Sequence, residues 1–133
     1  MLLARTPAGA EALCRRSLVL NEALRNRAGV ARAYLQLGLL RERRGDLDQA
    51  RFFLGEAQGL YAAAGDGVGQ AVACGQLGFL RHCEGELRDA ETHYRKALAL
   101  GEQWSAPGVQ AEQWANLGNV ALPHREWTNA QEC

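Results

Sequence analysis

Apolar side chains recur along this chain at spacings of three and four residues, in segments separated by short turns rich in glycine and acidic residues. This spacing places them on one face of a helix. The predicted helices span residues 7–26, 30–44, 47–64, 68–84, 87–104 and 107–122, and a further helix begins at Trp127. No segment alternates between apolar and polar residues over a useful length, and no β-strand is predicted. The expected fold class is therefore all-α, with helices in antiparallel pairs.

The same pattern returns after forty residues. The positions that recur are Leu37-Gly38, Leu77-Gly78 and Leu117-Gly118, together with Ala50, Ala90 and Ala130. A constant period indicates one helix pair copied in tandem, with neighbouring copies burying a shared core. We therefore expect a single array: the second helix of a truncated repeat at 6–28, complete repeats at 29–66 and 67–106, and a third at 107–133 that is cut short.

Glycine marks both the predicted turns and the helix interiors. Gly45-Asp46 and Gly65-Asp66 pair a residue that readily ends a helix with one that caps the next, because glycine adopts the left-handed conformation and the carboxylate accepts from free N–H groups. The stretch from Asn26 to Gly29 is predicted as another turn. Gly38 falls inside a helix, where glycine costs about 1 kcal/mol relative to alanine. Its recurrence every forty residues predicts that the next helix packs closely there.

Charge is balanced overall but not along the chain. The formal net charge is zero, which argues against the broad basic surface that nucleic-acid binding requires. Residues 1–55 carry ten arginines and five acids, whereas residues 56–133 carry five basic residues and ten acids. This gradient is consistent with head-to-tail attraction or with electrostatic steering of a partner. The interpretation that we favour is simpler: solvated faces that differ in composition without a functional reason.

The remaining composition favours a protein of the cytoplasm without a cofactor. No apolar run approaches the length of a membrane span, and the N-terminal segment does not resemble a signal peptide. The four cysteines form no CxxC pair and are expected to be small buried side chains in a reducing compartment. Candidate metal ligands cluster only at His82-Cys83-Glu84, where consecutive helical residues point about 100° apart and cannot converge. No nucleotide-binding glycine motif is present. We expect no metal, no cofactor and no enzymatic activity.

The repeated residues resemble a known family. Tyr34, Cys74 and Trp114, each followed by Leu-Gly, then Gly-Asp or Gly-Glu, then the recurring alanines, are similar to the tetratricopeptide repeat (TPR). The forty-residue period resembles the longer variety found in bacterial signalling and regulator proteins and in G-protein-signalling modulators. One departure is the position three after the helical glycine, which is usually large and apolar and here is Arg41, Arg81 and Ala121.

The resemblance implies a right-handed solenoid whose first helices line a concave groove that binds a peptide or helix of a partner protein. The groove positions carried over from the family are Arg32, Leu35, Leu39, Glu42, Arg43, Val72, Gly75, Phe79, His82, Cys83, Glu112, Ala115, Asn119 and Leu122. Some members of the family bind a C-terminal carboxylate with Lys and Asn at set groove positions. The equivalent positions here hold Arg32, Leu35, Gln36 and Leu39, with Asn119 the lone match, so such a clamp is not expected. Leu35, Leu39 and Phe79 form an apolar strip rimmed by charge, which suits an amphipathic ligand.

Two alternatives to a peptide-binding groove follow from the same sequence. The first alternative is a structural or oligomerisation scaffold within a larger regulatory protein, with no ligand of its own. A remnant effector or nucleic-acid-binding segment is the weaker alternative. Because both ends of the array are truncated, we also expect exposed apolar surface there, with fraying or self-association. Trp104, Trp114 and Trp127 near the C-terminus are predicted to pack between helices or to anchor an interface.

Overall fold

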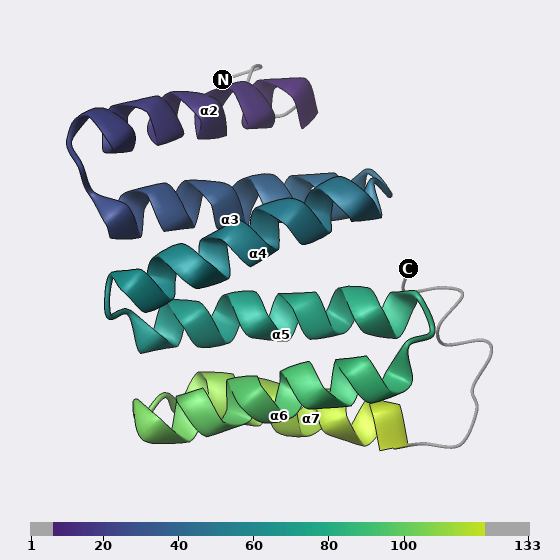
Figure 1. The fold of residues 1–133 in the computed structure, drawn as a ribbon. Helices are drawn as coiled ribbons and strands as arrows, with labels where there is room; N and C mark the ends of the chain where they lie inside the picture. The colour runs from purple at the N-terminus through teal and green to yellow at the C-terminus, as the bar shows by residue number, and fades with distance from the viewer. Residues whose placement is uncertain (1–6, 122–133) are drawn as a thin grey trace.

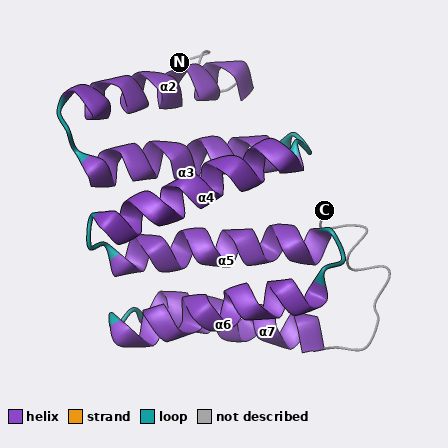
Figure 2. Ribbon diagram, viewed as in Figure 1, coloured by secondary structure: helices purple, strands orange, loops and turns teal. Residues whose placement is uncertain are grey.

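A computed structural model describes residues 7–121 of the chain, and this part consists of helices joined by short turns, with no strand (Figure 2). The helices are α2 (Pro7–Ala23), α3 (Arg27–Arg43), α4 (Leu47–Ala63), α5 (Gly67–Cys83), α6 (Leu87–Gln103) and α7 (Pro107–Ala121). The all-α prediction is confirmed. The helix predicted from Trp127 lies outside the described residues.

Each helix begins twenty residues after the previous one, so one repeat of forty residues contains two helices and two turns. Gly45, Gly65 and Gly85 close the three central turns with φ of 79°, 74° and 80°. These values lie in the left-handed region that glycine adopts without steric cost, as predicted. The corresponding positions in the outer turns hold Arg25 (φ 56°) and Ser105 (φ 50°), where a side chain makes this conformation less favourable.

The turn predicted from Asn26 to Gly29 is wrong in extent, because α3 already begins at Arg27. Asn26 is the residue before the helix, and its side chain accepts a hydrogen bond from the Gly29 N–H at 3.2 Å. Asp66 caps α5 in the same way, accepting from the Gly69 N–H at 2.9 Å. Asp46 makes no such bond at the start of α4. Its carboxylate lies 3.4 Å from Arg41 Nη1 instead, so the predicted cap at Asp46 is wrong.

Successive helices pack against one another and form a stack that runs from α2 to α6 and α7 (Figure 1). Contacts also join α3 to α5 and α5 to α7, which are second neighbours in the chain. Among the described helices, α2, α4 and α6 make no comparable contacts with each other. The first helices of the pairs therefore lie closer together than the second helices do. We call the side formed by α3, α5 and α7 the inner face of the solenoid.

The core lies between neighbouring helix pairs. One cluster contains Ala31, Ala57, Tyr61 and Ala73, and a second contains Ala50, Leu54, Leu77 and Leu80. The helical glycines let these helices approach, as predicted. A Cβ added at Gly38 would lie 2.7 Å from Leu54 Cγ, and one at Gly78 would lie 2.8 Å from the Tyr94 ring. At Gly118, no described residue comes within 4 Å of such a Cβ.

Arg41 and Arg81, each three residues after a helical glycine, form ion pairs. Arg41 Nη2 lies 2.8 Å from Glu11 Oε2 and so connects α3 to α2. Burial opposes ionisation of Glu11, but the hydrogen bond from Arg15 and the charge of Arg41 outweigh it and lower the pKa of Glu11. Arg81 lies 3.5 Å from Glu84, which also pairs with Arg51 of α4. Ion pairs thus connect α3 to α2 and α4 to the end of α5.

Candidate functional site

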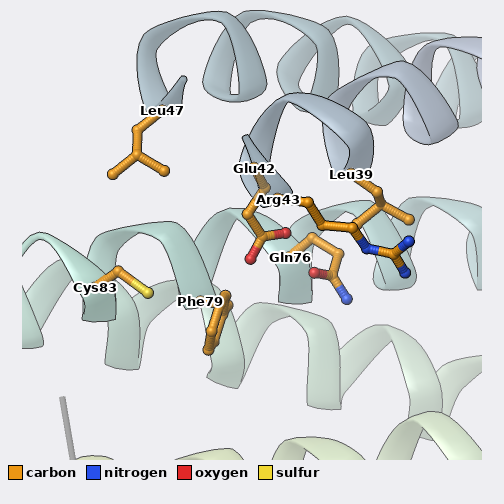
Figure 3. Close-up of a pocket in the computed structure, with 7 residues that line it drawn as sticks. All are labelled: Leu39, Glu42, Arg43, Leu47, Gln76, Phe79 and Cys83. Carbon is orange, nitrogen blue, oxygen red and sulfur yellow. The ribbon is translucent and has the colours of Figure 1, made fainter. Parts of the chain in front are cut away.

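Two adjoining hollows follow the inner face. The larger, with a volume of about 500 Å³, lies between α3 and α5 beside the start of α4 (Figure 3). Its lining residues are Leu39, Glu42, Arg43, Leu47, Gln76, Phe79 and Cys83. The smaller, of about 230 Å³, extends towards α7 and is lined by Glu42, Gly75, Gln76, Phe79, Glu112 and Asn116. Because Glu42, Gln76 and Phe79 border both, the hollows form one continuous surface, which we call the inner groove.

Helical geometry explains why these residues share one surface. Leu39, Glu42 and Arg43 are spaced by three and four residues, so they form a stripe along α3. Gln76, Phe79 and Cys83 form the matching stripe along α5. Glycine at position 75 leaves room for the α7 side chains, because a Cβ there would lie 2.9 Å from Gln113 Nε2. Gln113 is fully buried at this contact and thereby fixes α7 against α5.

The centre of the inner groove combines an aromatic ring with a carboxylate. Figure 3 shows the Glu42 carboxylate projecting from α3 into the space above Phe79 and beside Gln76. Burial raises the pKa of Glu42, and the nearby positive charge of Arg43 only partly offsets this effect. Glu112 on α7 adds a second carboxylate, which accepts a hydrogen bond from Gln113 Nε2 at 3.3 Å. The groove therefore presents a half-buried ring between two acidic groups.

The structure brings half of the predicted groove residues together. Those that line the inner groove are Leu39, Glu42, Arg43, Gly75, Phe79, Cys83 and Glu112. Of the other seven, Leu122 lies outside the described residues, and Ala115 is exposed and lines neither hollow. Leu35 packs against both core clusters, and Arg32 hydrogen-bonds to Tyr61. Val72 and His82 on α5 are half-buried, and Asn119 near the end of α7 is exposed; none of these three lines either hollow.

Three lining residues escaped the sequence prediction. Gln76 and Asn116 stand forty residues apart and in register with Gln36. This recurring amide side chain on the first helix of each pair could have predicted that the position lines the groove. Leu47 is the first residue of α4, the second helix of its pair. A rule that assigns the groove to first helices alone misses it. Its contribution follows from the short turn that brings the start of α4 to the end of α3.

The cysteines differ from one another. Cys74 is buried, and its thiol donates to the His93 carbonyl at 3.2 Å. Because burial raises the pKa of this thiol to about 11, Cys74 is an unreactive residue of the core. Cys14 is half-buried and, like Cys74, free. Cys83 is disulfide-bonded. The expectation of reduced, buried thiols throughout is therefore wrong for Cys83, and cysteine usage no longer supports a reducing compartment. The cytoplasmic location stays a prediction.

The inner groove is the main candidate site in the described part of the chain. Residues 7–121 contain no group of three or more side chains placed to hold a metal ion. None of the helices in this region has the length and apolar character needed to cross a membrane. No protein-family model matches the chain, and no curated protein matches it.

Proposed function

We propose that this chain is a non-catalytic protein-interaction module of the TPR family, and that its inner groove binds a helix or an extended peptide of a partner protein. The forty-residue period, the paired helices and the helical glycines against Leu54 and Tyr94 support the family assignment. The continuous hollow along α3, α5 and α7 is the observation that carries the binding proposal.

The groove has the composition of a binding surface. Phe79 is half-buried, so a ligand side chain that covers it removes apolar area from water at little cost in ordering, because the ring is already held by α5. Leu39 and Leu47 extend the apolar contact, and Gln76 and Asn116 offer amide donors and acceptors to a peptide backbone. An aromatic anchor surrounded by polar groups is the usual arrangement at interfaces where a few residues supply most of the affinity.

The acidic groups define the partner's charge. Glu42 forms no salt bridge with another described residue, and its neighbour Arg43 does not fully offset its burial. A ligand cation placed beside Glu42 would therefore replace lost solvation with a charge-assisted hydrogen bond. We propose that the preferred ligand carries an apolar side chain for Phe79 next to a lysine or arginine for Glu42 or Glu112.

A peptide selection tests this proposal. Random peptides are selected on the wild-type chain, and their affinity for Phe79→Asp and Phe52→Asp is then measured by calorimetry. Phe52 is the matched control, because it is 59% exposed on α4 and lines neither hollow. We expect at least a tenfold loss, about 1.4 kcal/mol, for Phe79→Asp only, and basic residues in the selected peptides. Equal affinity of both variants, or failure to select any peptide, would refute groove binding.

A second candidate function, a structural or oligomerisation scaffold, is favoured by a separate observation. Large apolar side chains are exposed on the outer helices, with Leu20 of α2 61% exposed and Trp114 of α7 57% exposed. Neither residue lines the inner groove. This surface does not require a peptide ligand.

A further inference from the structure

The two hollows of the inner groove differ in the charges that border them. Of the two, Arg43 lines only the larger and Glu112 only the smaller, whereas Glu42 borders both. A cation is therefore attracted more strongly, and repelled less, in the smaller hollow. We propose that this hollow of about 230 Å³ binds an arginine side chain of the partner, with the guanidinium over the Phe79 ring and between the carboxylates of Glu42 and Glu112. This assignment rests on the groove binding proposed above.

The two carboxylates reach the hollow from different helices. Glu42 projects from α3 into the space above Phe79 and beside Gln76 (Figure 3), and Glu112 belongs to α7. The helix between them is α5, which contacts both α3 and α7. Neither carboxylate forms a salt bridge with another described residue, and burial raises the pKa of Glu42. A cation between them would form charge-assisted hydrogen bonds on two sides.

The aromatic ring in the hollow favours arginine over lysine. A guanidinium group is planar, stacks on aromatic faces and donates hydrogen bonds along its edges, whereas an ammonium group is compact and strongly hydrated. The planar group can therefore cover Phe79 while its edges donate to the carboxylates on either side. Gln76 and Asn116 add amide oxygens as further acceptors. The larger hollow, with Leu39 and Leu47, remains for the apolar side chain of the ligand.

The contact between α5 and α7 holds the hollow in shape before a ligand arrives. Gln113 is fully buried, and its Nε2 atom would lie 2.9 Å from a Cβ added at Gly75. Its neighbour Glu112 is thereby fixed relative to Phe79, although the Glu112 side chain itself is exposed. A site that is already formed loses less entropy on binding. Because Glu42 is half-buried and Glu112 is exposed, Glu42 should contribute more to the affinity.

A nuclear magnetic resonance titration of the whole chain tests the arginine assignment. The probes are N-acetyl-arginine amide, N-acetyl-lysine amide and the uncharged N-acetyl-citrulline amide, which has nearly the shape of arginine. We expect the arginine probe to shift the amide signals of Gln76, Phe79 and Asn116 and to bind at least about threefold more tightly than the lysine probe. The citrulline probe should leave these signals in place. The assignment is overturned by equal affinity for the arginine and lysine probes, by shifts confined to other acidic surfaces, or by no shift at all.

Matched variants separate the hollow from general attraction to acidic groups. Glu42→Gln keeps the size of the side chain and should weaken binding of the arginine probe at least about fivefold, with a smaller loss for Glu112→Gln. Phe79→Leu keeps an apolar side chain without a ring and should remove most of the preference for arginine over lysine. The control is Glu56→Gln, exposed on α4 and outside both hollows. Equal losses for Glu56→Gln and Glu42→Gln would overturn the assignment. Circular dichroism verifies that every variant folds.

The peptides selected in the groove experiment distinguish failure of this assignment from failure of groove binding. Exchanging the arginine of a selected peptide for lysine or citrulline should lower its affinity at least about tenfold. Peptides that bind through Phe79 but tolerate the exchange, or contain no arginine, leave groove binding intact and overturn the arginine assignment. If no peptide is selected but the arginine probe binds as described, groove binding fails and the smaller hollow is still an arginine site.

Discussion

Leu37 of α3 and Leu117 of α7 stand at the same position of the repeat, eighty residues apart, yet Leu37 is fully buried and Leu117 is only half-buried. The alanines six residues earlier differ in the same way, since Ala31 is fully buried and Ala111 is exposed. The sequence motif is the same in both helices. The difference arises because α3 lies between α2 and α4, whereas α7 has only α5 and α6 beside it among the described helices.

The other end of the described array shows the same loss of burial. Leu54 and Tyr94 occupy one position of the second helix and are both fully buried, whereas Cys14 at the same position of α2 is half-buried. Among the described helices, α2 contacts only α3, whereas α4 and α6 each contact two neighbouring helices. In a repeat protein, stability divides into the contributions of single repeats and of the contacts between them. The outer helices should accordingly be the least stable part of the described region.

The largest expected difference between centre and end is for the two leucines. Leu37→Ala should lower the free energy of unfolding by about 3 kcal/mol, because it removes a buried side chain and leaves a cavity. Leu117→Ala should cost about 1 kcal/mol, because its side chain already contacts water. Urea unfolding, at a concentration where sedimentation shows monomers, measures both values. Equal losses would mean that α7 is as well covered as α3.

The helical glycines should respond with opposite signs. Gly38→Ala is expected to cost about 1 kcal/mol net, since its Cβ would overlap Leu54 and the crowding outweighs the gain in helix propensity. Gly118→Ala should raise the stability of the monomer by up to about 1 kcal/mol, because its Cβ meets no described residue. Thermal unfolding of the two variants provides the measurement. Destabilisation by Gly118→Ala in the monomer would indicate a close neighbour at that position.

The smallest expected effect concerns the ion pairs that attach α2. Glu11→Gln should cost about 1 kcal/mol at neutral pH, because Glu11 contacts Arg15, Arg41 and Arg44. The pKa of Glu11 is lowered from 4.5 in the folded chain, so its contribution is complete above that value and is lost as the pH falls through the folded pKa. The wild-type and Glu11→Gln unfolding curves should therefore converge in acid.

Glu91→Gln is the control for that experiment. Glu91 pairs with Arg95 within α6, at exposed side chains, and connects no second helix. Its replacement should change the free energy of unfolding by less than about 0.5 kcal/mol. If both variants lose the same stability, the network around Glu11 contributes no more than an isolated surface pair, and α2 is held by its apolar contacts alone.

Much of the fold was predictable because its signals are local. Helix spacing, the Gly45 and Gly65 turns and the close packing at Gly38 all follow from residues within one repeat. The Asp46 cap was not predictable, because its carboxylate is drawn towards Arg41, five residues earlier, instead of the free N–H groups of α4. The start of α3 at Arg27 was also missed, because Asn26 was interpreted as part of a turn. In the structure Asn26 is the N-cap of the helix.

The candidate site was predictable only in part. Leu39 and Phe79 share a register position, and both line the inner groove. Leu35 was assigned to the same surface, but a rotation of about 40° around α3 relative to Leu39 turns it towards the two core clusters. Leu47 enters the groove from a different helix. Such outcomes depend on how neighbouring pairs are rotated against each other, which no single helix specifies.

The sequence by itself determined the helices, their twenty-residue spacing and the tandem arrangement, because hydrophobic periodicity and turn chemistry act over a few residues. Only the tertiary structure decided which apolar positions are core, which line the inner groove and which are left exposed on α2 and α7. The physical reason is that burial requires partners on both sides of a helix. Identical motifs therefore have different surroundings in the centre of the array and at its outer helices.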